Sequence, residues 1–219
     1  MNKITKLIGN LREAGSNILL VCLRTIHYKI RGRNIIPHQN TIIKGVKNIY
    51  TNNNILYIGL NNYGFIHKRD RAFLNIQGKL SLNGNFWIGR GCRLDIGKNA
   101  TVELGRYSFI NPFTDLIIMH SLKIGNNCSI SWHCQFLDED FHQIRYERKP
   151  DENGNKGIEI GDNVWIGSYV YIYKGVKIPN GCIIASNSVV KDSFDEENAL
   201  IAGNPAKIVK RNVSWGEDG

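Results

Sequence analysis

The apolar positions in the second half of the chain repeat every six residues. Between Ile158 and Asp192 these positions are Ile160, Ile166, Ile172, Ile178, Ile184 and Val190. An amphipathic helix requires a spacing near 3.6 residues and a half-buried strand a spacing of about 2, so a period of six fits neither element alone. It fits a prism of short strands joined by tight turns, in which each coil covers the inward residues of the next. The sequence therefore predicts an all-β fold, a parallel β-helix of hexapeptide repeats.

The same repeat extends towards the N-terminus with interruptions. From Ile76 to Phe136 apolar residues recur at six-residue intervals, apart from shifts of two residues after Leu94, Val102 and Leu116. A corner lengthened by two residues would produce each shift. In residues 35–75 the repeat is faint, and we expect irregular coils there. We assign residues 35–203 to the β-helix.

Residues 1–34 are predicted to form a helical segment. Its apolar stripe contains Ile4, Leu7, Ile8, Leu11, Ile18 and Leu19, and basic residues lie off that stripe. Such a helix could cap the open first coil, which solenoids need for solubility, or lie on an anionic membrane surface, and the two roles are compatible. The apolar run of residues 18–23 is much shorter than the roughly 20 residues of a membrane span. We do not predict a signal peptide, because no small-residue cleavage site follows this run.

Residues 204–219 are predicted to form a short C-terminal helix and a tail. Asn204 followed by Pro205 is a favourable pair for the N-cap and first turn of a helix. On a helix Lys207 would share one face with Lys210 and Arg211.

The repeat stops in residues 138–157, which are rich in charge, glycine and asparagine. A loop of this length in a compact solenoid is more often functional than not. It contains His142, preceded by Asp138, Glu139 and Asp140. A nearby carboxylate can orient an imidazole and raise its basicity, as a general base requires. His142 is therefore a candidate base, and an incidental loop histidine is the alternative.

Composition and charge narrow the possible partners. The formal net charge is +9, which indicates an acidic partner without identifying it. Cys92, Cys128, Cys134 and Cys182 stand at small inward positions of the repeat, so we interpret them as buried thiols of a protein in a reducing compartment. The histidines lack the close spacing of a zinc site, and we expect no metal.

Ser168 and Ser186 are separated by eighteen residues. Three hexapeptides make one coil, so these two residues should stack on one outer line of the prism, beside Trp165. Stacked hydroxyl groups next to an aromatic wall would suit an elongated ligand. Ordinary outward polar residues are the alternative.

The run NVWIGSYVYIYKGVKIPNGCIIASNSVVKD, followed by AGNPAKIVKR, resembles the C-terminal half of the hexapeptide-repeat acyltransferases. The resemblance covers about residues 104–211. It is strongest to the sugar and polysaccharide O-acetyltransferases related to the galactoside and maltose acetyltransferases. It implies a left-handed β-helix, an exception to the usual right-handed crossover. It also implies a homotrimer that binds acetyl-CoA in clefts between neighbouring prisms.

The resemblance also implies roles for single residues. His142 would take the proton of an acceptor hydroxyl, with Asn111 and Asp140 on the acceptor side. Ser168 would steady the oxyanion at the thioester, and Ser186 would line the pantetheine arm. The remaining residues would border the acetyl-CoA cleft or contact its phosphates: Trp165, Lys191, Lys207, Lys210 and Arg211.

Two departures from the family pattern leave the acceptor open. The galactoside-type relatives carry Thr-Lys where this chain has only Lys191, and the loop that holds His142 is one residue out of step with theirs. Its continuation from Arg145 to Lys156 also differs.

We therefore expect an acetyl-CoA-dependent O-acetyltransferase that acts on a sugar hydroxyl in the assembly of a cell-surface polysaccharide. We expect a cytoplasmic location with peripheral contact at the inner membrane face through the N-terminal helix, and no nucleic-acid partner. One alternative is an N-acetyltransferase of amino sugar nucleotides. Others are a zinc lyase of the γ-carbonic-anhydrase kind, with His120, His133 and His142 as ligands, and a solenoid scaffold without enzymatic activity.

Overall fold

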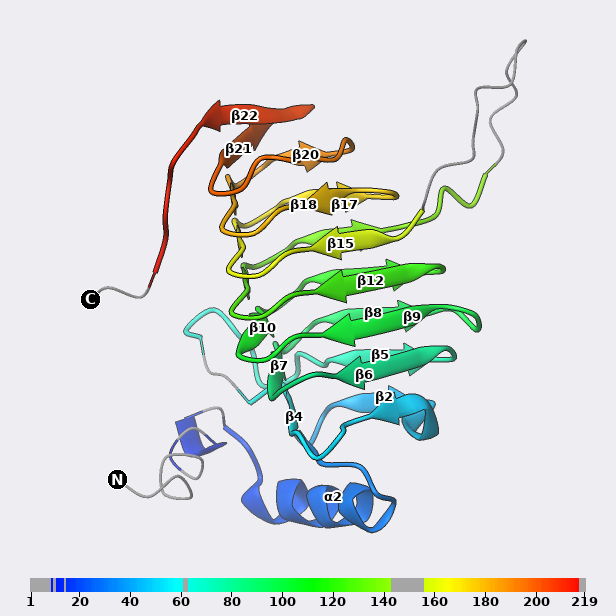
Figure 1. Ribbon diagram of the computed structural model, residues 1–219. Coiled ribbons are helices and arrows are strands. Elements are labelled where there is room, and N and C mark those ends of the chain that lie inside the picture. The colour runs from blue at the N-terminus through cyan, green and yellow to red at the C-terminus, as the bar shows by residue number, and fades with distance from the viewer. Residues whose placement is uncertain (1–8, 10, 14, 61–62, 143–155, 217–219) are drawn as a thin grey trace.

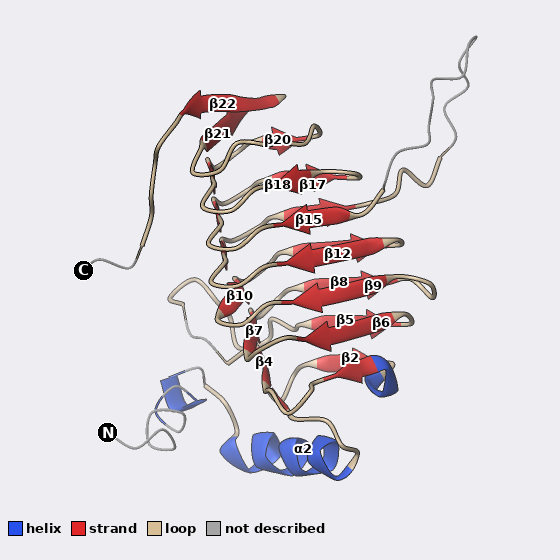
Figure 2. Ribbon diagram, viewed as in Figure 1, coloured by secondary structure: helices blue, strands red, loops and turns tan. Residues whose placement is uncertain are grey.

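The protein is a prism with three faces, each a parallel β-sheet (Figures 1 and 2). The computed structural model describes residues 9, 11–13, 15–60, 63–142 and 156–216. Successive strands enter the three sheets in turn, and the coils rise from β2 near one end to β20 near the other as a left-handed helix. The predicted parallel β-helix is confirmed.

The strand boundaries follow the three sheets. The first sheet contains β1 (Ile35–Pro37), β4 (Leu56–Ile58), β7 (Phe86–Ile88), β10 (Ser108–Ile110), β13 (Ser129–Ile130), β16 (Trp165–Ile166), β19 (Ile183–Ile184), β21 (Leu200–Gly203) and β22 (Ala206–Lys210). The second contains β2 (Ile42–Lys44), β5 (Phe73–Ile76), β8 (Arg93–Ile96), β11 (Asp115–Ile118), β14 (Gln135–Leu137), β17 (Tyr171–Tyr173) and β20 (Val189–Val190). The third contains β3 (Ile49–Tyr50), β6 (Lys79–Leu82), β9 (Thr101–Leu104), β12 (Ser121–Ile124), β15 (Ile158–Ile160) and β18 (Lys177–Ile178).

The inward residues of each coil lie directly on those of the next. Ile166 pairs with Ile184, one coil and eighteen positions later, and both are fully buried. Ile110 pairs with Ile130, twenty positions later, so a corner with two extra residues keeps the register. This confirms the explanation of the two-residue shifts in the repeat.

The small inward positions are filled by thiols. Cys134 Sγ donates to the Gly167 carbonyl oxygen at 3.1 Å, and Cys128 Sγ donates to that of Gly161 at 3.1 Å. Burial raises the pKa of Cys128 and Cys134 to about 11, so both thiols remain protonated at neutral pH. The predicted burial of Cys92, Cys128, Cys134 and Cys182 is confirmed.

Helix α2 (Ile18–Ile30) lies across the open end of the first coils (Figure 1). Asn17 caps it by accepting a hydrogen bond from the Leu20 amide at 3.2 Å. Val21 and Tyr28 are buried against the prism, so the interpretation of this segment as a cap is confirmed. Within the described residues no helix has the length and apolar character needed to cross a bilayer.

One detail of the predicted helical stripe is wrong. Gly15 adopts a φ of 61° and a new helix begins after Asn17, so the helical phase is reset there. Leu11 is consequently buried, whereas Leu19 points outward and is largely exposed. Ile4, Leu7 and Ile8 lie outside the described residues.

The predicted C-terminal helix is also wrong, because residues Ala206–Lys210 form strand β22, antiparallel to β21. A helix of so few residues has little stability of its own, whereas β21 presents an unpaired edge that a strand can satisfy. Ala206 and Ile208 pack towards the core. Lys207 pairs with Ala202 and Lys210 with Leu200, and a β-bulge between these pairs leaves both lysines on the outward side of the strand.

The stacking of inward residues predicts a large effect of core truncation. Leu94 on β8 lies between Leu74 and Leu116 and is almost fully buried. We expect Leu94→Ala to lower the free energy of unfolding by about 2–5 kcal/mol, because a cavity remains between coils. Thr101→Ala, on the exposed side of β9, should cost less than about 1 kcal/mol. Urea denaturation measures both, and equal losses would contradict this account.

Candidate active site

His142 lies where the chain leaves the prism, between β14 and β15, at the corner that joins the second sheet to the third. Up to residue 142 the chain turns away from the stacked coils at this corner (Figure 1). The His142 side chain is exposed, and its ring has no hydrogen-bond partner among the described residues. The imidazole is thus accessible to a ligand.

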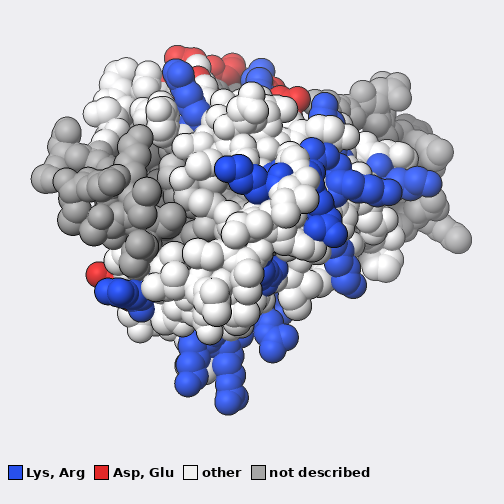
Figure 3. Space-filling model, turned by 90° about the horizontal axis from the view of Figure 1, so that it is seen from below, with Lys and Arg blue, Asp and Glu red and all other residues white. Residues whose placement is uncertain are grey.

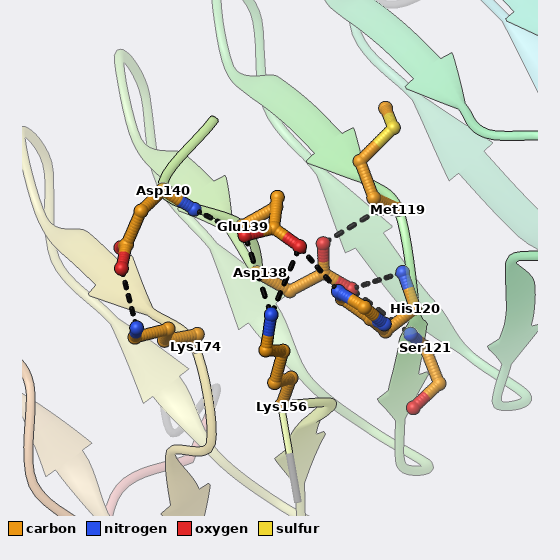
Figure 4. Close-up of polar contacts among 8 residues, drawn as sticks. All are labelled: Met119, His120, Ser121, Asp138, Glu139, Asp140, Lys156 and Lys174. Atoms are coloured by element: carbon orange, nitrogen blue, oxygen red, sulfur yellow. Dashed lines mark hydrogen bonds and ion pairs between the residues drawn. The ribbon is translucent and has the colours of Figure 1, made fainter. Parts of the chain in front are cut away.

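Asp138 anchors the start of this excursion. Its carboxylate is fully buried and accepts hydrogen bonds from three successive amides of the coil below: Met119 at 2.6 Å, His120 at 2.8 Å and Ser121 at 2.9 Å (Figure 4). A buried carboxylate is tolerable only when its oxygens are satisfied in this way. Asp138 therefore fixes the position from which the chain departs.

Glu139 joins the two ends of the excursion (Figure 4). Its Oε2 atom lies 2.8 Å from His120 Nε2 and 3.1 Å from Nζ of Lys156, where the described chain resumes. Hydrogen bonds from His120, Lys156 and the Asp140 amide lower the pKa of Glu139 to about 2. Glu139 is therefore ionised at neutral pH, and it bridges the residues that precede the loop to Lys156, which follows it.

Asp140 forms an ion pair with Lys174, from the coil above (Figure 4). All three carboxylates before His142 are thus used to fix the loop to the prism. The expected contact between one of them and the His142 imidazole is not formed among the described residues. The role of Asp140 towards an acceptor stays a prediction.

Ser168 and Ser186 lie at a different corner, which joins the first sheet to the second. Ser186 Oγ accepts a hydrogen bond from the Ser168 amide at 3.1 Å. The predicted stacking of the two serines is confirmed. Since the Ser168 amide is occupied, only its hydroxyl group is available to stabilise an oxyanion.

Trp165 stands beside these serines on β16 and is 40% exposed. Its Nε1 atom lies 3.4 Å from Ser131 Oγ. Trp215, in the C-terminal tail, packs against it with ring centroids 6.3 Å apart and donates a hydrogen bond to the Asn163 carbonyl oxygen at 2.7 Å. The pattern of the sequence did not predict that Trp215 lies beside Trp165, because the tail returns over the first sheet only in the folded chain.

Two of the basic residues near the C-terminus form ion pairs. Lys191 lies 3.5 Å from Asp192, and Nε of Arg211 forms a 2.9 Å ion pair with Glu196. Lys207 and Lys210 are both exposed, and the β-bulge between them leaves both on the outward side of β22. Their contacts with CoA phosphates stay predictions.

Asn111 lies at the same corner as the serines, two coils below Ser168. It is almost fully buried, and its Oδ1 atom accepts a hydrogen bond from the Tyr63 hydroxyl at 2.6 Å. Tyr63 belongs to the segment between β4 and β5, which folds back over this corner. The carboxamide is therefore held in one orientation.

An aromatic surface next to Asn111 was not predicted. The rings of Phe113, His133 and Tyr169 stack along the corner, with centroids 5.1 Å apart between the first two and 4.8 Å between the last two. Beside this ladder Tyr63 and Phe65 stack on each other, and Trp132 packs edge to face against both. We call these six residues the aromatic corner.

The ladder follows from the backbone of the corner. Phe113, His133 and Tyr169 each stand three residues after the last residue of a strand in the first sheet, and each has a φ near 60°. The same backbone conformation in successive coils directs each ring onto the next. An aromatic residue three positions after each inward anchor would have revealed this ladder in the sequence.

These elements are distributed over two corners of one prism. His142 lies at one, whereas Asn111, the aromatic corner, Trp165 and the two serines lie at or beside the other. His120 is paired with Glu139 near His142, and His133 is stacked in the ladder. In the described part of the chain no three His, Cys, Asp or Glu side chains gather as a metal site would require.

Residues 157–192 match the family model described as bacterial transferase hexapeptide (six repeats). The chain is 37% identical, over 98% of its length, to 96% of an uncharacterized 24.8 kDa protein in the cps region of Klebsiella pneumoniae. It is 30% identical to the galactoside O-acetyltransferase of Escherichia coli K12, over 58% of this chain and 61% of that enzyme.

Among solved structures, the chain resembles the polysialic acid O-acetyltransferase OatWY. The TM-score is 0.59 at 27% identity, with 82% of this chain and 89% of that one covered.

The depressed pKa of Glu139 predicts a pH-dependent contribution to stability. A carboxylate with a lowered pKa stabilises the folded state above its unfolded pKa, and that contribution is lost as the pH falls from about 5 towards 2. Glu139→Gln should therefore lower Tm at pH 6, and its difference from wild type should shrink at pH 3. Glu103→Gln, an exposed residue of β9, is the matched control and should shift Tm little at either pH. If Glu139→Gln changed Tm by the same amount at pH 6 and pH 3, the stabilising role of the ionised Glu139 carboxylate would be contradicted.

Proposed function

The chain belongs to the family of bacterial transferases with hexapeptide repeats and is an acyltransferase, and on that basis we propose that it transfers the acetyl group of acetyl-CoA to a sugar hydroxyl. The observation that carries this proposal is His142, accessible and without a polar partner among the described residues, on a loop fixed by Asp138, Glu139 and Asp140. An imidazole that is held on a fixed loop and has no polar partner in the described part of the chain suits a general base that must meet a substrate proton.

In the proposed reaction, the His142 imidazole accepts the proton of the acceptor hydroxyl. The oxygen then attacks the thioester carbonyl carbon, and the Ser168 hydroxyl donates a hydrogen bond to the resulting oxyanion. Collapse of this intermediate breaks the carbon–sulfur bond, and the departing CoA thiolate takes the proton from the imidazolium. The products are an O-acetyl sugar and CoA.

Acceptor binding is proposed at the aromatic corner. Sugar rings carry flat apolar faces that pack on aromatic rings, and Phe65 and Tyr169 are about half exposed there. Asn111, with its oxygen engaged by Tyr63, presents its amide group in a fixed direction. Similarity to O-acetyltransferases of galactosides and polysialic acid supports a carbohydrate acceptor, and we propose a cell-surface polysaccharide or its precursor.

We also propose that the active site is completed by a second copy of the chain. The base and the candidate binding surfaces lie at different corners of one prism, so one chain does not bring them together. Prisms packed side by side would place the His142 corner of one copy against the Trp165 and Ser168 corner of its neighbour. Each prism offers one corner of each kind to a neighbour, so such contacts can close into a ring, and we propose a ring of three copies.

The buried thiols of Cys92, Cys128, Cys134 and Cys182 suit a reducing compartment, which supports a cytoplasmic location for this reaction.

The role of His142 is tested by His142→Ala. We expect kcat/KM to fall at least about 100-fold, because the acceptor proton loses its base. Acetyl-CoA should raise Tm of the variant as much as that of wild type, since the donor surfaces are intact. His27→Ala, an exposed histidine of α2, is the matched control and should retain activity.

The assay is CoA release over a panel of sugars and glycan intermediates. Mild alkaline hydrolysis of the product removes an O-acetyl ester and leaves an N-acetyl amide. Full activity of His142→Ala would contradict the general base, and an alkali-stable product would show transfer to an amine instead.

The shared site is tested by combining two inactive variants in one assembly. His142→Ala removes the base, and the double variant Trp165→Ala/Ser168→Ala damages the opposite corner. In mixed assemblies formed by co-expression, about a quarter of neighbouring pairs unite two intact halves, so about a quarter of wild-type activity should return. Activity no greater than the sum of the separate variants would contradict a site between subunits.

A further inference from the structure

Helix α2 has a second apolar face that no other part of the described chain covers. Leu19, Leu23, Ile26 and Ile30 are each more than half exposed, and Ile30 is 79% exposed. Their spacing of four, three and four places them in one stripe along the helix. The opposite face holds Val21 and Tyr28, buried against the prism. Single exposed apolar residues are ordinary, but a continuous stripe of four large side chains marks an interaction surface.

The surface around this stripe is positively charged. Between Glu13 and Asp70 the sequence contains no acidic residue and eight basic ones. These are Arg24, Lys29, Arg31, Arg33, Lys44, Lys47, Lys68 and Arg69. This part of the sequence forms α2 and the first coils, so its charge is gathered at one end of the prism. Seen from below, that end shows Lys and Arg side chains around an uncharged surface, with few acidic groups (Figure 3).

The basic residues differ in where their side chains point. Arg24 is turned inward, where it donates to the Gln39 carbonyl oxygen at 2.6 Å and the Thr41 carbonyl oxygen at 2.7 Å. Lys29 and Arg31 are exposed at the C-terminal end of α2, beside the apolar stripe. The exposed cations therefore flank the apolar residues on the outer side of the helix.

We infer that this end of the protein binds the surface of an anionic lipid bilayer, with α2 lying in the plane of the interface. An apolar stripe bordered by cations is the arrangement of interfacial helices, whose apolar side chains enter the acyl boundary while Lys and Arg meet the headgroups. Leu19, Leu23, Ile26 and Ile30 would insert. Lys29 and Arg31 would contact lipid phosphates. The helix has thirteen residues, which suits lying on a bilayer and not crossing it.

Charge favours lipid over a second copy of the chain as the occupant of this surface. A second copy that docked on the stripe through the same end would bring its own Lys and Arg residues and no carboxylates, because residues 14–69 contain no acidic residue. Like charges held together at an interface are unfavourable. An anionic bilayer instead complements both the apolar stripe and its cationic border.

The orientation of α2 leaves the rest of the molecule accessible. The helix runs across the end of the prism, perpendicular to the direction in which the coils stack (Figure 1). A bilayer at this end would leave the His142 corner at the side of the prism, above the lipid surface. If copies pack side by side as proposed above, several α2 helices would face the same bilayer and strengthen binding.

The test is sedimentation of the full chain with sucrose-loaded vesicles. We expect binding to phosphatidylcholine vesicles that contain about a third phosphatidylserine or phosphatidylglycerol, little binding to pure phosphatidylcholine, and a steep loss in high salt. Leu23→Gln/Ile26→Gln should lower the partition coefficient about tenfold or more, because two inserted side chains become polar. Lys29→Gln/Arg31→Gln should reduce the preference for anionic over neutral vesicles.

Controls separate lipid binding from folding and catalysis. Tyr107→Gln removes an exposed ring outside α2 and should leave vesicle binding unchanged. Both α2 variants should keep the wild-type Tm and CoA release with a soluble acceptor, because the altered side chains point away from the prism. The inference is overturned if wild type does not bind anionic vesicles or binds neutral ones equally. It is also overturned if Leu23→Gln/Ile26→Gln binds like wild type, or if that variant changes the oligomeric state in size-exclusion chromatography.

Discussion

Each coil of this protein is stable only because the next coil covers its inward side chains. Ile166 under Ile184 and Leu94 under Leu116 are single instances of a contact that runs through the whole prism. The same stacking pairs the strand edges, so backbone groups in the middle of the prism are satisfied by the coils on either side. The two ends lack one neighbour, and each is closed by an element outside the repeat. Helix α2 covers one end and strand β22 pairs with the last coil at the other.

The constraint of stacking also explains how the chain can leave the prism at residue 138 and return. An excursion between two stacked strands would separate the coils unless its two ends were held. Asp138 binds three amides of the coil below, Glu139 bridges to Lys156 at the point of return, and Asp140 reaches Lys174 above. The acidic residues that precede His142 serve this attachment, and the imidazole is left for a ligand. The position of the proposed base thus depends on electrostatic contacts of its neighbours with three different coils.

The corners determine where ligands can bind. Phe113, His133 and Tyr169 occupy the same place in successive coils, each with the backbone in the left-handed conformation, so their rings stack in line. The stack forms a surface along the axis of the prism that no single coil could form. This surface and the His142 corner belong to different edges of the prism. In our proposal the reaction needs both the aromatic surface and His142, so catalysis requires that copies of the chain associate. The outer face of α2 adds a further level, because it would orient that assembly on a lipid surface.

The sequence by itself determined the period of six, the lengthened corners, the burial of the four inward cysteines and the stacking of Ser168 on Ser186. These follow from one-dimensional spacing, because each coil repeats the geometry of the one before. It also singled out His142, through the break in that spacing. Only the tertiary structure decided that residues Ala206–Lys210 pair as a strand, because the free edge of β21 outweighs the weak preference of a short segment. Only the tertiary structure revealed the hydrogen bond between Tyr63 and Asn111, which are forty-eight residues apart, and the exposed apolar face of α2. Those contacts join segments whose separation along the chain carries no period, so local patterns could not reveal them.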